Sequence, residues 1–174
     1  SGNLGSGWRY ETRRQLGVPL NYWTEEYPHE INIDWGNGRS ETFSLTLSPD
    51  SFLEAPLGTI SVSLVNSDGT SDTLTILDNT EGLSYDMVAG NLLNEDFSAW
   101  APQNFLLTRY DGTMFYFNID NGLYKVEDTY GRTIEITDSG IIYSEGGSIS
   151  FNRDEQGRIP SISEGLGNEV VYTY

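Results

Sequence analysis

The chain has 174 residues and a formal net charge of −17, and it contains no cysteine. This length suffices for one domain with a sizeable core, while the charge repels phosphate backbones and anionic membrane surfaces, so neither nucleic acid nor membrane insertion is expected. The absence of cysteine excludes disulfides, thiolate metal sites and thiol nucleophiles.

The beginning of the chain carries the alternation of apolar and polar residues that is typical of half-buried strands. Apolar residues alternate with polar ones over 31–35 and again over 43–47, and Gly36 and Gly38 lie between the two segments. This arrangement predicts a hairpin with a glycine-rich turn. A connection is expected over 48–56.

The next segments carry weaker signals. Apolar alternation over 60–64 and 74–76 flanks a turn at Gly69, so a strand is expected on each side of it. The best helical candidate in the chain is 83–100, but Gly90 interrupts it. A loop with a single helical turn is expected there as an equal alternative.

The second half of the chain alternates between short strands and turns about every ten residues. Its turn residues are Asp111-Gly112, Asp120-Asn121-Gly122, Tyr130-Gly131, Asp138-Ser139-Gly140 and Gly146-Gly147. This spacing predicts an all-β fold, in which successive antiparallel β-hairpins form an extended, curved repeat sheet. We expect an N-terminal β-rich region over 1–106 and repeated hairpins over 107–174, within one continuous structural unit.

Two internal similarities support a repeat. Segments 64–76 and 107–119 align without gaps, each with a strand, an Asp-Gly-Thr turn and a second strand. Segments 128–136 and 154–162 form another pair, with their glycines 26 residues apart. Hairpins repeated at such periods predict an array in which each unit packs mainly on its neighbours.

The last segment, DEQGRIPSISEGLGNEVVYTY, resembles the tyrosine-aspartate (YD) repeat of the Rhs proteins. That repeat contains an aspartate, a Gly-Arg pair, a short strand, a glycine turn and a strand that ends in Tyr-x-Tyr. The matching residues are Asp154, Gly157, Arg158, Ile159, Gly167, Asn168, Tyr172 and Tyr174. Pro160 departs from the pattern, because it falls inside a repeat strand.

The resemblance extends to three earlier segments. The first, 123–139 with Gly131 and Arg132, is similar to a degenerate repeat. The second, 111–123, begins with Asp111 and Gly112 and is similar to the segment that precedes the first repeats. The third, 4–16, resembles a Leu-Gly-x-Gly-Trp motif ahead of the repeats. An extra hairpin at Gly146-Gly147 stretches the usual repeat spacing.

This resemblance implies a large exported bacterial protein, secreted or held at the cell surface, in which YD repeats wind into a hollow β-shell around a toxin or other effector. The chain would be a structural scaffold from the beginning of that shell, with no catalytic role and no cofactor. Its partners would be further repeats of the same polypeptide and the enclosed effector region. The strand over 170–174 is then expected to leave an unpaired edge.

The sequence offers few groups for catalysis or metal binding. His29 is the single histidine, which excludes zinc sites of the His/Cys type. Turns such as 66–72 contain oxygen ligands suited to calcium, but hairpin turns use the same residues for backbone reasons, so no metal site is expected. A further alternative is an acid pair of the glycosidase kind, drawn from Glu25, Glu26, Asp34, Glu95 and Asp96.

Aromatic residues near the N-terminus favour a different alternative. Four of them are candidates for stacking on sugar rings: Trp8, Tyr22, Trp23 and Tyr27. They would belong to an extracellular β-module that binds carbohydrate or another component of a cell surface. The competing interpretation is structural, with Trp8 and Trp35 filling the core of the sheet.

Overall fold

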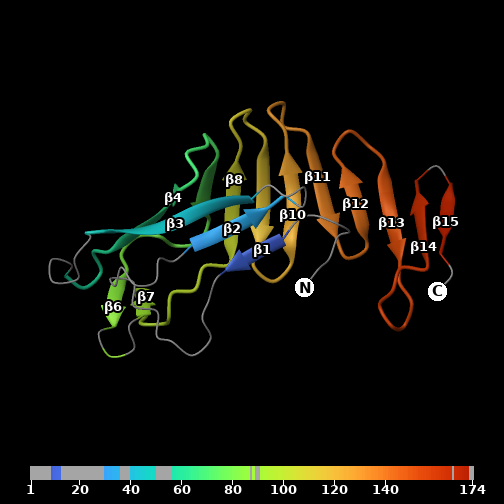
Figure 1. The fold of residues 1–174 in the computed structure, drawn as a ribbon. Coiled ribbons are helices and arrows are strands. Elements are labelled where there is room, and N and C mark those ends of the chain that lie inside the picture. Colours follow the sequence, from blue (N-terminus) through green and yellow to red (C-terminus); the bar gives the residue numbers. More distant parts are fainter. Residues whose placement is uncertain are drawn as a thin grey trace.

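The computed structural model describes residues 9–12, 30–35, 40–49, 56–86, 88, 91–165 and 167–172. These residues form strands, turns and isolated bridges with no α-helix, which confirms the all-β prediction. Figure 1 shows an extended sheet of hairpins, β8 to β15, which a smaller sheet crosses at one end. The described part of the chain also has no helix long and apolar enough to cross a membrane.

The smaller sheet has four antiparallel strands in the order β1-β2-β3-β4. Its strands are β1 (Arg9–Thr12), β2 (Glu30–Asp34), β3 (Ser40–Ser48) and β4 (Ser61–Asn66). Ile31 of β2 lies opposite Phe43 of β3, and Ile33 lies opposite Glu41. The hairpin predicted from the alternation over 31–47 is therefore confirmed.

The larger sheet has nine strands in the order β15-β14-β13-β12-β11-β10-β9-β8-β5. Its strands are β5 (Thr73–Ile76), β8 (Asn104–Thr108), β9 (Met114–Asn118), β10 (Gly122–Glu127), β11 (Thr133–Thr137), β12 (Gly140–Tyr143), β13 (Ser148–Asn152), β14 (Ser161–Glu164) and β15 (Glu169–Val171). Each strand from β8 onward pairs antiparallel with the next one. The predicted succession of antiparallel hairpins is confirmed.

The two segments that align in sequence, 64–76 and 107–119, differ in their pairing. The second forms the hairpin β8–β9, whereas the first divides between the sheets, because β4 pairs with β3 and β5 pairs with β8. In the loop of the first segment, Asn66 Nδ2 donates to Asp72 O at 3.1 Å. Asp68 Oδ2 accepts from the Thr42 amide at 2.5 Å, which ties this loop to the first sheet.

The helical alternative for 83–100 is wrong. This segment contains a two-stranded hairpin, β6 (Ser84–Asp86) with β7 (Asn91–Leu93). The amide of Leu83 donates to the carbonyl of Ile60 at 2.9 Å, and the amide of Ile60 donates back at 3.0 Å. Because this bridge holds the backbone of Leu83 extended beside residue 60, and because Leu83 and Leu92 are fully buried, the segment follows strand geometry.

The core lies where the two sheets face each other. Phe43 of the smaller sheet and Leu107 of the larger sheet are both fully buried. Trp35 meets Phe115 edge to face, with the ring centroids 5.6 Å apart. The remaining buried apolar residues come from both sheets and from the segment between them: Ile33, Ile60, Val62, Leu74, Ile76, Leu83, Leu92, Trp100, Phe105 and Phe117.

The apolar face of the larger sheet continues beyond the smaller one. Residues directly opposite each other on paired strands share a face, and the register places Phe115 opposite Val126 and Val126 opposite Ile134. A bulge between Leu123 and Lys125 adds one residue to β10 and thereby keeps Val126 on the apolar side. We define the open apolar face as Val126, Ile134, Ile136, Ile141, Tyr143, Ile149, Phe151, Ile162 and Val170.

The opposite face of the same strands is mainly polar. Ile142 lies opposite Glu135 on one side and Ser148 on the other, and Ser163 lies opposite Glu169. Antiparallel sheets commonly cover one face and leave the other in water, which explains this division. Ile142 is the apolar exception on that side of β12, and 49% of it is exposed.

Candidate functional site

Six turns within the described residues share one backbone geometry. The amide of the first residue donates to the carbonyl of the fifth, and the amide of the fourth donates to the carbonyl of the first. The fourth residue has a positive φ, as in a type I turn followed by a left-handed residue. These turns begin at Asn94, Arg109, Asp128, Tyr143, Asp154 and Glu164. The predicted turn residues that take the fourth position are Gly112, Gly131, Gly146, Gly157 and Gly167.

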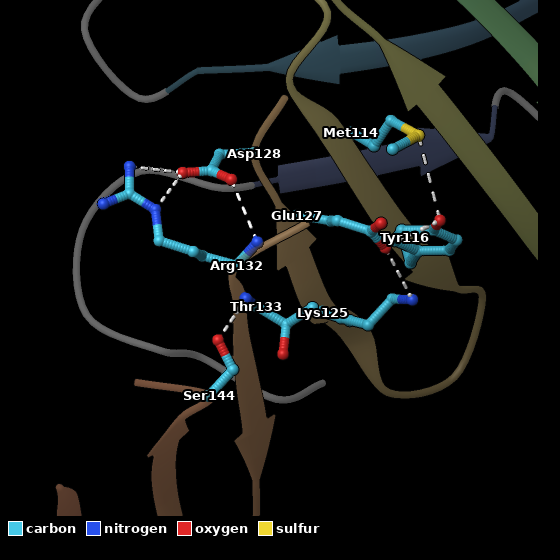
Figure 2. A network of polar contacts seen from close by, with 8 residues as sticks. All are labelled: Met114, Tyr116, Lys125, Glu127, Asp128, Arg132, Thr133 and Ser144. Atoms are coloured by element: carbon cyan, nitrogen blue, oxygen red, sulfur yellow. Dashed lines mark hydrogen bonds and ion pairs between the residues drawn. The ribbon is translucent and has the colours of Figure 1, made fainter. Parts of the chain in front are cut away.

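Two of the six turns have the sequence Asp-x-x-Gly-Arg and the same side-chain hydrogen bonds. In the first, Asp128 Oδ1 accepts from the amides of Tyr130 and Arg132 at 2.9 and 3.0 Å. Asp128 Oδ2 accepts from Arg132 Nε at 2.6 Å, and Figure 2 shows the contacts between Asp128 and Arg132. In the second, Asp154 Oδ1 accepts from the amides two and four residues later at 3.0 and 2.8 Å, and Oδ2 accepts from Arg158 Nε at 2.7 Å. Aspartate and arginine together thus close the turn.

We expect these two turns to lose stability in acid. Partial desolvation opposes ionisation, but hydrogen bonds from the arginine side chain and the turn amides outweigh it and hold the pKa of Asp128 and of Asp154 below the ordinary value. A lowered pKa adds stability that is present above the unfolded-state pKa and is lost as the pH falls through the folded-state pKa. The loss should therefore occur below about pH 4.

The carboxyl ¹³C shifts of the two aspartates, followed by NMR between neutral and acidic pH, measure this effect. Asp128→Asn and Asp154→Asn should each make the acid-induced decrease in the free energy of unfolding smaller, because each removes one titrating carboxylate. A titration midpoint at or above that of an unstructured aspartate would contradict the assigned hydrogen bonds.

The two Asp-x-x-Gly-Arg turns lie on opposite sides of the sheet along the strand direction, one at each end of its strands. The turn at Asp128 connects β10 to β11, and the turn at Asp154 lies between β13 and β14. Because each strand reverses direction, the intervening strands β11, β12 and β13 place the second turn at the other end. The odd number of intervening strands is the cause, so the two turns repeat in geometry but do not form one site.

Three other residues of the predicted repeat signature have structural contacts of their own. Asp111 Oδ1 accepts from the amide of Thr113 at 2.9 Å, within the turn that begins at Arg109. Asn168 Nδ2 donates to Glu164 Oε1, between the fifth and first positions of the last turn. The amide of Tyr172 donates to the carbonyl of Pro160 at 2.7 Å, which extends the pairing of β14 with β15.

Several predicted site residues fall outside the part of the chain that the structure describes. They are Tyr174 of the repeat signature, His29, Glu25 and Glu26, and the candidate glycan-stacking residues Trp8, Tyr22, Trp23 and Tyr27. Pro160 is described, and it immediately precedes β14, a position where its missing amide hydrogen does not disrupt strand pairing.

A hollow of about 260 Å³ lies where the open apolar face meets the Asp128 turn. Val126, Ile134 and Tyr143 line it from three adjacent strands. The other lining residues are Asp128, Arg132, Thr133, Ser144 and Glu145. The Thr133 amide donates to Ser144 Oγ at 2.8 Å, which joins the two strands beside the hollow (Figure 2). A space of this size accommodates one side chain rather than a large ligand.

The opposite face carries a separate polar cluster, also drawn in Figure 2. Lys125 Nζ lies 3.2 Å from Glu127 Oε2 and 3.8 Å from the centroid of the Tyr116 ring. Desolvation lowers the pKa of Lys125, but the hydrogen bond from its ammonium to Glu127 and the negative groups around it raise that pKa above the ordinary value. The ammonium is therefore charged and paired, a structural arrangement rather than that of a nucleophilic lysine.

The sequence did not predict a buried ionic contact beside the paired strands β5 and β8. Asp72 is 2% exposed, its Oδ1 accepts from the amide of Tyr110 at 2.8 Å, and its Oδ2 lies 3.5 Å from Arg109 Nε. The Arg109 guanidinium carbon lies 4.9 Å from the centroid of the Trp35 ring. These residues are distant in sequence, so no local pattern joins them. The loop 66–72, considered above for calcium, instead uses its aspartates within the protein.

The described residues contain no group of three or more acidic or histidine side chains placed to hold a metal ion. Comparison with known proteins gives no significant match: no family model, no curated protein and no solved structure is similar to the chain. We therefore infer a function from the turns, the open apolar face and the outer edge of β15.

Proposed function

We propose that the chain is a non-catalytic structural segment of a large exported bacterial Rhs/YD-repeat protein. In this proposal its hairpins form part of a β-shell that encloses or displays an effector region, outside the cell or at its surface. The observation that carries the proposal is the Asp-x-x-Gly-Arg turn, which occurs twice with the same hydrogen bonds within one uninterrupted meander of strands.

The outer edge of β15 supports this proposal. β15 pairs with β14 through Val170 and Tyr172, because the amide of Tyr172 donates to Pro160 and Val170 lies opposite Ile162. In an antiparallel ladder the alternate residues direct their backbone groups the other way, so those of Glu169 and Val171 face the outer edge. No described strand occupies that edge, which offers donors and acceptors to a further strand.

The coding gene tests the proposal. We expect the reading frame that contains this sequence to encode further units, each with an Asp-x-x-Gly-Arg turn, a glycine turn and a strand that ends in Tyr-x-Tyr. An export signal and an effector-like region should belong to the same polypeptide. A frame that encodes no further unit on either side would overturn the proposal.

A further inference from the structure

We propose that the open apolar face, with the hollow beside the Asp128 turn, binds a separate polypeptide segment that is extended and basic and carries apolar side chains at alternate positions. This inference concerns the surface alone and does not depend on membership of the Rhs family. Three features of the described residues lead to it: an apolar face without a covering layer, a hollow of side-chain size, and an acidic surround.

The first feature is the extent of the face. The register continues the apolar face from β10 to β15, with Glu164 of β14 as an acidic member opposite Ile149. Figure 1 shows β12 to β15 as a single layer beyond the crossing sheet. Tyr143 and Val170 are 38% and 56% exposed on that face. A contiguous apolar surface of this kind, bordered by polar turns, is typical of a protein-binding surface.

The second feature is the hollow. Its apolar wall consists of Val126, Ile134 and Tyr143, and its border carries Glu145 and the Asp128–Arg132 pair. At about 260 Å³ it suits one aromatic or branched aliphatic side chain. An extended segment that places one apolar residue there directs its alternate residues away from the sheet, toward water.

The third feature is charge. Residues 104–172 contain eleven acidic and five basic residues. All five basic residues already contact acceptors in the protein: Arg109 with Asp72, Lys125 with Glu127, Arg132 with Asp128, Arg158 with Asp154, and Arg153 with the carbonyls of Asp138 and Gly157. Exposed acids lie in successive turns, among them Asp111, Asp120, Glu145 and Glu155.

This charge selects the partner. A basic segment gains attraction from the acidic turns on both sides of the face, which also speeds its association. A second copy of the chain would bring another net charge of −17 to the same surface. The charge therefore disfavours pairing of two open faces and favours a basic partner.

The test uses the 174-residue chain and two fluorescein-labelled synthetic peptides of twelve residues, one alternating Lys and Leu and the other alternating Glu and Leu. Fluorescence anisotropy should detect binding of the Lys-Leu peptide and at least about tenfold weaker binding of the Glu-Leu peptide. Raising the salt concentration should weaken the Lys-Leu complex, because salt screens exposed charges. Equal binding of the two peptides, or binding of neither, would overturn the proposal.

A matched pair of variants locates the surface. Ile141 lies on the open apolar face and Ile142, the next residue of β12, lies on the opposite face. Ile141→Lys should weaken binding of the Lys-Leu peptide about tenfold or more, whereas Ile142→Lys, with the same change in charge, should leave it within about twofold. An equal loss of peptide affinity in the two variants would overturn the assignment of binding to the open apolar face.

NMR of the unmodified chain keeps the test decisive if a variant misfolds. The Lys-Leu peptide should shift the methyl signals of Ile136, Ile141 and Ile149 and leave that of Ile142 unchanged. A chain that is already dimeric through these residues, as shown by analytical ultracentrifugation with the same methyl signals broadened, would assign the face to a second copy and contradict the proposal.

Discussion

Gly140→Ala is expected to lower the free energy of unfolding by at least about 3 kcal/mol. Gly140 begins β12 and lies opposite Ser150 of β13. Its φ is 154°, and a Cβ at this position would lie 2.0 Å from the carbonyl oxygen of Ile149. Since the obstacle is backbone, no flexible side chain can move aside, and the pairing of β12 with β13 must shift.

Urea unfolding followed by circular dichroism measures this loss. Gly146→Ala is the matched control, because Gly146 also has a positive φ, 96°, yet no heavy atom lies within 4 Å of its added Cβ. The control should lose only about 1 kcal/mol, the cost of the left-handed conformation alone. Equal losses for Gly140→Ala and Gly146→Ala would mean that β12 and β13 do not approach as closely as described.

Asp72→Ala is expected to lower the free energy of unfolding by about 3 kcal/mol. The substitution removes the acceptor of the Tyr110 amide and the buried partner of Arg109 beside β5 and β8. The partly buried guanidinium would keep its ring contact with Trp35 but lose its counter-charge. A charge left without its partner in a buried site is costly, and this cost dominates the effect.

Asp72→Asn separates the two contributions. Its amide oxygen can still accept from the Tyr110 amide, so its free energy of unfolding should lie between those of the unmodified chain and Asp72→Ala. Glu127→Ala, which breaks the more exposed pair with Lys125, should cost about 1 kcal/mol or less. Thermal and urea unfolding of the three variants provide the comparison, and a loss at Asp72 no larger than that at Glu127 would contradict a buried ionic contact.

Local patterns predicted the strands and turns well. Period-2 alternation located β2 and β3, and Gly131 and Gly157 marked turns that require a positive φ. These signals succeed because a strand's faces and a turn's backbone depend on residues only a few positions apart.

Non-local contacts escaped prediction. The partner of β5 is β8, which begins 28 residues after β5 ends, and no feature of the loop 66–72 reveals that the chain changes sheets there. Gly140 was expected as a turn residue, but its close approach to Ile149 depends on a different hairpin. Asp72 and Arg109 likewise meet only after β5 has paired with β8, since they flank the Thr73–Thr108 pair.

The position of the second Asp-x-x-Gly-Arg turn also could not be predicted from local sequence. The 26-residue spacing suggests a simple repeat, yet the three strands between the turns reverse the direction of the second unit. The bulge between Leu123 and Lys125 keeps the apolar face continuous, and the alternation of apolar and polar residues did not predict it either. The first feature follows from the number of strands between the turns and the second from one extra residue in β10, and local propensity determines neither.

Electron cryomicroscopy of the parent polypeptide is the most direct test of the central proposal. That proposal is that the chain is one structural segment of a longer β-meander. We expect a further antiparallel strand on the outer edge of β15, hydrogen-bonded to the backbone of Glu169 and Val171, with the order from β8 to β15 preserved. A parent structure in which that edge of β15 contacts only water, or in which the meander is replaced by another fold, would contradict it.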